Sequence, residues 1–86
     1  MSGFTAVVTD IREESRIAGR HRWQIALDHT DFSPGTTGEL QAVARSGARL
    51  VVPVLDTIVD LTGQVWHVVE KPLAAGTTVT GHMRLE

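Results

Sequence analysis

The sequence predicts a small, mainly β protein: a barrel-like sheet of five or six strands with one short helix around residues 37–46. Residues 20–29 alternate apolar and polar side chains, which is typical of a half-buried strand. Several other short runs rich in Val, Ile and Thr are separated by Gly, Pro and Asp, which mark turns. With 86 residues, we expect the chain to form a single small globular domain around one modest core.

Residues 4–11 predict a first strand whose apolar side chains lie on both faces. Residues 10–19 are ambiguous. Asp10 and Glu13 have the spacing of a helix capping box, and Gly19 suits the end of a helix. The apolar residues are too sparse for a good helix face, so a long polar hairpin connection fits equally well.

Residues 20–29 give the cleanest strand of the chain. His21, Trp23, Ile25, Leu27 and His29 share one face, and polar residues occupy most of the other. We expect Trp23, Ile25 and Leu27 to lie in the core. Burial of such side chains contributes roughly 1.5–3 kcal/mol each.

The helix around residues 37–46 follows a loop at residues 30–38. Thr36 and Glu39 have capping-box spacing, and Leu40, Val43 and Ala44 form a helical stripe. The alternative is a hairpin that turns at Ser46-Gly47, which leaves neither face cleanly apolar.

Residues 48–55 form a continuous apolar strand, and Pro53 indicates a sheet edge or a bulge because proline cannot donate a backbone hydrogen bond. Residues 56–63 are either another short strand or one helical turn capped by Asp56. The number of elements suggests, by analogy alone, an OB-like barrel.

Residues 64–86 predict a closing hairpin that turns around residues 72–76. Pairing across that turn would align His67 with Gly81 and Val69 with Val79 on a core face. A glycine inside a strand marks a bulge, a bend or a close approach of the backbone. The opposite face would carry Trp66, Val68, Thr80, His82 and Arg84.

Composition limits the possible functions. The chain has no cysteine, which excludes disulfides and thiolate metal sites, and its net charge of −2 gives no overall basic field. The first residues lack a basic segment followed by a long apolar run, and no apolar run approaches the roughly 18 residues of a membrane span. We therefore expect a cytoplasmic protein that does not enter membranes, with no metal, cofactor or catalytic residues.

The leading hypothesis is a non-enzymatic binding or assembly module that contacts a protein partner, or its own copy, through Trp66, Val68, Thr80, His82 and Arg84. Trp and Arg are typical anchors of protein interfaces. The same face would instead be core if another element covered it.

Two alternatives remain open. One is an OB-like binder of single-stranded nucleic acid that uses Arg12, Arg16, Arg20 and Arg22 around the first connection. The other is a small ligand-binding protein or enzyme with a site at Asp28, His29 and Asp31, where carboxylates flank an imidazole.

Overall fold

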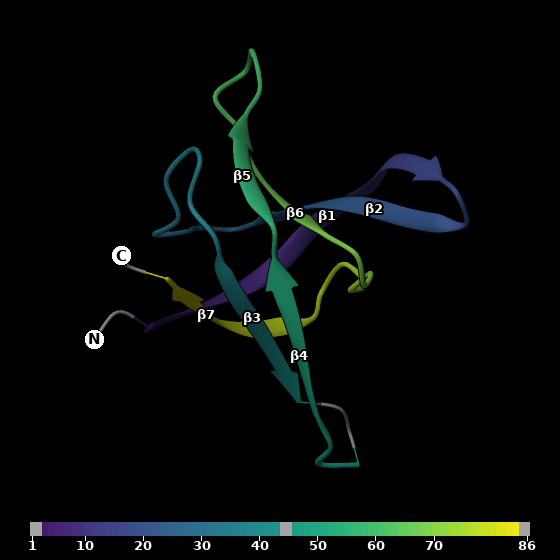
Figure 1. Ribbon diagram of the computed structural model, residues 1–86. Helices are drawn as coiled ribbons and strands as arrows, with labels where there is room; N and C mark the ends of the chain where they lie inside the picture. Colours follow the sequence, from purple (N-terminus) through teal and green to yellow (C-terminus); the bar gives the residue numbers. More distant parts are fainter. Residues whose placement is uncertain (1–2, 44–45, 85–86) are drawn as a thin grey trace.

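The computed structural model describes residues 3–43 and 46–84, which form one sheet of seven antiparallel strands (Figure 1). The strands are β1 (Gly3–Ile17), β2 (Arg20–Leu27), β3 (Gly38–Val43), β4 (Arg49–Val54), β5 (Asp56–Val59), β6 (Val65–Val69) and β7 (Thr78–Met83). Their order across the sheet is β4-β3-β7-β1-β2-β6-β5. The mainly β class is confirmed. The predicted barrel is not, because the two edge strands, β4 and β5, do not pair with each other among the described residues.

Two segments connect the two halves of the sheet, which are β4-β3-β7-β1 and β1-β2-β6-β5. Residues 3–7 of β1 pair with β7, and β1 pairs with β2 from Val8 onward, with a register shift between Val8 and Asp10. Leu55 joins β4 to β5, and its N–H donates to the carbonyl oxygen of Val68 (2.8 Å) while Asp56 also pairs with Val68. Two residues against one is the arrangement of a β-bulge, which bends a strand and increases its twist. The sheet therefore bends over its own inner face at both places.

One core fills the space inside this bend. Strands of both halves contribute to it, as do two loop residues, Phe32 and Leu73. The buried members are Ala6, Val8, Ile25, Leu27, Phe32, Leu40, Ala42, Val52, Val54, Val69, Leu73 and Val79. The expected core positions of strand β2 are confirmed for Ile25 and Leu27, and Trp23 packs against the cluster while partly buried.

The predicted helix around residues 37–46 is wrong for the described residues; Ala44 and Arg45 lie outside them. Residues 38–43 form β3, which pairs with β4 on one side and β7 on the other. Differences in helix propensity amount to a few tenths of a kcal/mol per residue, and hydrogen bonding to two neighbouring strands outweighs them. The alternative hairpin between β3 and β4 is the one that forms.

The predicted hairpin of residues 64–86 is also wrong. β6 pairs with β2 and β5, whereas β7 pairs with β1 and β3, so two strands separate them. Gly81 lies opposite Phe4 rather than His67, and a Cβ at Gly81 would approach the Phe4 ring to 2.5 Å. The glycine thus makes room for an aromatic ring on the neighbouring strand.

Residues 10–17 continue β1 instead of forming a helix or a long connection. The chain reverses through Ala18 and Gly19, whose φ angles of 51° and 78° are both positive. Positive φ at both central residues is the signature of the tight turn that matches the twist of a two-stranded ribbon. Residues 56–59 form β5, which is the strand alternative predicted for that region.

The strand at residues 38–43 makes a prediction that a helix would not. Leu40 is 0% exposed and Val43 is 64% exposed, although a helix would place both on one stripe. We expect Leu40→Ala to lower the free energy of unfolding by about 2–5 kcal/mol, because it leaves a cavity in the core. Val43→Ala is the matched control and should cost less than about 0.5 kcal/mol in urea denaturation. Similar losses for both variants would contradict the strand.

Candidate functional site

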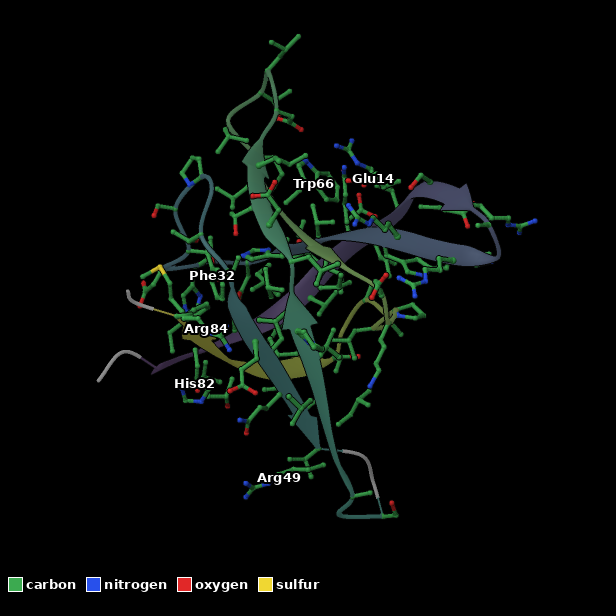
Figure 2. The ribbon with its side chains drawn as sticks, viewed as in Figure 1. Glu14, Phe32, Arg49, Trp66, His82 and Arg84 are labelled. Carbon is green, nitrogen blue, oxygen red and sulfur yellow. The ribbon has the colours of Figure 1, made fainter. Side chains whose placement is uncertain are left out.

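The predicted interface residues do not form one surface. Trp66 and Val68 lie on β6 and are buried, whereas Thr80 and His82 lie on β7 and are half-buried. Arg84 follows β7 and is exposed. Figure 2 shows Trp66 on a different part of the sheet from His82 and Arg84. The structure therefore separates the set into two local environments.

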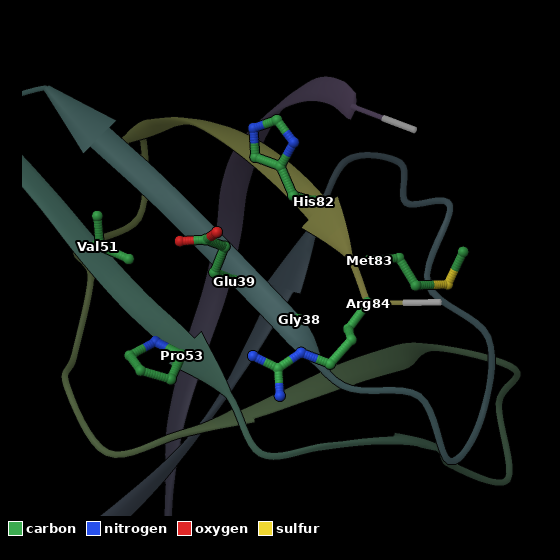
Figure 3. A pocket seen from close by; sticks show the side chains of 7 residues that line it. All are labelled: Gly38, Glu39, Val51, Pro53, His82, Met83 and Arg84. Carbon is green, nitrogen blue, oxygen red and sulfur yellow. The ribbon is translucent and has the colours of Figure 1, made fainter. Parts of the chain in front are cut away.

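His82 and Arg84 line a shallow groove on the outer face of β3, β4 and β7 (Figure 3). The groove has a volume of about 290 Å³ and is lined by Gly38, Glu39, Val51, Pro53, His82, Met83 and Arg84. Glu39 pairs with His82 across one ladder and with Pro53 across the other. The groove therefore combines a carboxylate, an imidazole and a guanidinium with apolar side chains, which suits recognition of a polypeptide.

The outward edge of β4 lies beside this groove. Arg84 N–H donates to the carbonyl oxygen of Thr37 (2.8 Å), and hydrogen-bonded residues alternate along an antiparallel ladder. This alternation fixes which backbone groups of β3 face β7 and which face β4. The β4 residues whose backbone faces β3 are therefore Leu50, Val52 and Val54, and those whose backbone faces outward are Arg49, Val51 and Pro53. In the described chain, no strand pairs with that outward edge.

The opposite edge of the sheet, β5, is covered at Thr57. The backbone groups of Thr57 face away from β6. Its carbonyl oxygen accepts a bond from Gly35 N–H (2.8 Å), and its N–H donates to the Asp56 carboxylate (2.8 Å). The Thr57 hydroxyl also donates to the Thr36 carbonyl oxygen (2.9 Å). A loop that satisfies outward backbone groups in this way hinders strand addition at that position. The two edges of the sheet thus differ in their capacity to accept another strand.

Most of the exposed large apolar side chains lie along the segment that forms these edges. Among the described residues, the exposed large apolar side chains are Val43, Leu50, Val51, Leu55, Val59 and Leu61. Leu50 and Val51 belong to β4 itself, with 39% and 41% of their surface exposed. An unpaired edge flanked by apolar side chains is a typical site for association.

Trp66 belongs to a polar network on the outer face of β1, β2 and β6. Its Nε1–H donates to the Asp60 carboxylate (2.9 Å), and the Arg12 guanidinium lies 3.9 Å from the centre of its ring. Arg12 also donates to Gln24 (2.6 Å), and Gln24 donates to Glu14 (2.8 Å). Arg12, from the predicted nucleic-acid set, thus covers Trp66, from the predicted interface set.

Asp60 anchors this network at the β5–β6 turn. Its carboxylate accepts bonds from the Thr62 hydroxyl and N–H, from Gln64 N–H and from the Trp66 indole. These bonds, that of the Thr62 hydroxyl first, lower the pKa of the Asp60 carboxyl well below its usual range. The Asp-x-Thr-Gly segment before the strand is a turn signal, but nothing in the sequence connects it to Arg12.

The other predicted arginines lie on the β1–β2 hairpin. Arg16, Arg20 and Arg22 are exposed, and β6 pairs with β2 only at residues 23–25. The end of the hairpin therefore projects as a two-stranded ribbon (Figure 1). His21 stacks on Trp23 along it, with ring centres 6.1 Å apart, and bonds Glu13 (2.8 Å).

In the predicted ligand site at Asp28, His29 and Asp31, the carboxylate of Asp28 has a structural role. Asp28 accepts a bond from Val7 N–H (3.0 Å), which lowers the pKa of its carboxyl. The same carboxylate lies 3.1 Å from His29 Nδ1. Asp28 therefore fastens the start of its loop to β1, and Asp31 is exposed.

Histidine often serves in functional sites, but His67 has a structural role. It is 0% exposed, its Nδ1–H donates to the Ile25 carbonyl oxygen (2.8 Å), and its Nε2 accepts from the Thr30 hydroxyl (2.9 Å). The Thr30 hydroxyl in turn accepts from Phe32 N–H (3.0 Å). Burial lowers the pKa of His67, so the ring is neutral and ties the loop after β2 to β6.

Within residues 3–43 and 46–84, no three His, Asp or Glu side chains come together in a group that could hold a metal ion. That part of the chain also contains no helix with the length and apolar character needed to cross a membrane. No family model matches the chain, and no curated protein matches it.

The buried His67 predicts a specific loss of stability in acid. Below about pH 6.5 the unfolded chain binds a proton at this residue while the folded chain does not, so stability falls as pH falls. The loss approaches about 1.4 kcal/mol per pH unit. Urea denaturation at several pH values between neutral and mildly acidic checks this.

His67→Gln should flatten the pH dependence, and the matched control His29→Gln, at an exposed site, should retain it. An unchanged slope in His67→Gln would show that another group titrates.

Proposed function

We propose that this chain is a non-enzymatic binding or assembly module that adds an extended segment of a protein partner to its β4 edge. The observation that carries the proposal is the outward row of backbone groups at Arg49, Val51 and Pro53, which no described strand pairs. Strand addition obtains affinity from main-chain hydrogen bonds and specificity from neighbouring side chains. The expectation of a cytoplasmic protein belongs to this proposal and rests on the sequence alone.

The groove supplies those neighbouring side chains. Val51 and Pro53 lie on β4, and Glu39, His82 and Arg84 follow on the same face. An added strand would place alternate side chains over this face, where Glu39 and Arg84 offer charges of opposite sign. Trp66, buried beneath Arg12, is outside the proposed contact.

Peptide selection tests the proposal without a known partner. A random peptide library is panned against protein tethered so sparsely that its copies cannot meet, and enriched peptides are measured by fluorescence anisotropy. We expect Val51→Pro to weaken their binding about tenfold or more, because it removes an outward N–H and blocks the approach of a strand. Leu61→Ser, at a fully exposed turn residue, is the control and should bind normally. Equal binding by Val51→Pro, or no enriched peptides, would reject the proposal.

A second candidate function is single-stranded nucleic-acid binding by the β1–β2 hairpin. It is favoured by the projecting ribbon with Arg16, Arg20 and Arg22 and by the stacked rings of His21 and Trp23. Aromatic rings beside basic side chains are the usual means of binding single strands. Glu13 and Glu14 lie at the base of the same hairpin and weaken its positive field.

A fluorescence titration with a mixed-sequence single-stranded oligonucleotide tests this candidate. Binding should quench Trp23 at about 50 mM salt and weaken strongly at about 200 mM, because phosphate contacts release counterions. Replacing Arg16, Arg20 and Arg22 with Ser should abolish the quench, whereas Arg49→Ser should not. A wild-type protein that gives no quench at the lower salt would remove this candidate.

A further inference from the structure

We propose that the partner at the β4 edge is a second copy of this chain, paired antiparallel about a two-fold axis that passes beside Val51. This inference rests on the proposed function and names its partner. A two-fold axis brings the same edge of both copies together, so each copy supplies and accepts identical contacts. The result would be one continuous antiparallel sheet across the two copies.

The backbone groups of β4 suit this arrangement. With Val51 opposite Val51 of the second copy, these residues exchange two N–H to carbonyl bonds. Arg49 N–H then donates to the carbonyl oxygen of Pro53 in the second copy, and the symmetric bond forms as well. Pro53 has no N–H and takes part only as an acceptor. Every outward N–H of β4 is used, and none is left without an acceptor.

Charge distinguishes this register from its neighbours. Arg49 lies opposite Pro53 of the second copy, and Glu39 is the residue paired with Pro53 across the next ladder. The long Arg49 side chain therefore lies on the same face as a carboxylate within its reach. A shift that pairs Arg49 with Val51 instead brings the two Arg49 residues to diagonal positions, where like charges repel.

A shift in the other direction meets an obstacle. It would pair Arg49 with Leu55 of the second copy, at the bulge where the chain leaves β4. Leu55 N–H is already bonded to the Val68 carbonyl oxygen (2.8 Å). The Val51-centred register is therefore the one in which both charge and backbone geometry agree.

Apolar side chains are covered by the same pairing. Val51, which is 41% exposed, meets its own copy, and such β-branched pairs stabilise neighbouring strands. Leu50, which is 39% exposed, lies on the inner side opposite Val52 of the second copy. Because a two-fold axis normal to the sheet keeps the faces together, the two Glu39–Arg84 grooves adjoin across the seam.

Light scattering during size-exclusion chromatography measures the oligomeric state over a wide range of concentration. We expect a dimer whose dissociation constant rises about tenfold or more in Val51→Pro, because two central bonds are lost. Val51→Lys provides a second variant in case the proline affects folding, since it places like charges opposite each other at an exposed position. Circular dichroism confirms that each variant is folded, and Leu61→Ser should remain dimeric.

Disulfide trapping checks the register, because the natural chain has no cysteine. Val51→Cys should cross-link to its own copy, since directly opposed Cα atoms about 5.5 Å apart lie within disulfide range. Arg49→Cys is the matched control and should not cross-link, because its copy lies four positions away along the strand.

A monomer at every concentration, a dimer insensitive to both Val51 variants, or faster cross-linking of Arg49→Cys would overturn the self-pairing. Peptide binding to sparsely tethered protein that Val51→Pro abolishes would then still support the proposed function.

Discussion

The bond between Leu55 N–H and the Val68 carbonyl oxygen marks the constraint on which the fold depends. At this point the chain leaves β4, one edge of the sheet, and immediately becomes β5, the other edge. Together with the irregularity near Val8 in β1, it bends a single sheet over its own inner face. A flat sheet of these strands would expose residues such as Leu40 and Val52, which are 0% exposed here. The core therefore exists because two segments, β1 and the continuous run from β4 to β5, connect the two halves.

The same segment explains why the two edges behave differently. β5 is short and lies beside the loop that contains Gly35, which bonds to its outward carbonyl group. Among the described residues, no loop bonds to the outward backbone groups of β4, and the protection of this edge consists of Pro53 and the charge of Arg49. These two residues restrict pairing without preventing it. Pro53 lacks a backbone N–H donor, and the positive charge of Arg49 repels another positive charge placed beside it. In the proposed pairing, such a restriction lets the edge select among partner strands.

The alternation of side chains predicted correctly which face of a strand is buried, but it did not predict which strands are neighbours. His67, Val69 and Val79 were assigned to the core side, and all three are buried, although β6 and β7 never meet. A period of two decides which side of a strand is apolar, but the choice of neighbour depends on contacts far apart in sequence. The site shows the same limit: the contact of Arg12 with Trp66 joins residues on strands that β2 separates. The sequence also allowed a hairpin at Ser46-Gly47, but helix propensity favoured a helix around Leu40, where the structure has a strand.

The position of β7 has a consequence for synthesis of the protein. This strand lies between β3 and β1, both of which are translated earlier. Until residues 78–83 leave the ribosome, β1 and β3 each present an open side, and Ala6 and Leu40 lack the strand that separates them. During synthesis, the sheet is therefore completed by insertion of a strand into its middle rather than by addition at its margin. During that interval, a nascent chain offers more unpaired backbone than the completed sheet does, so contact with a chaperone is most useful before β7 has emerged.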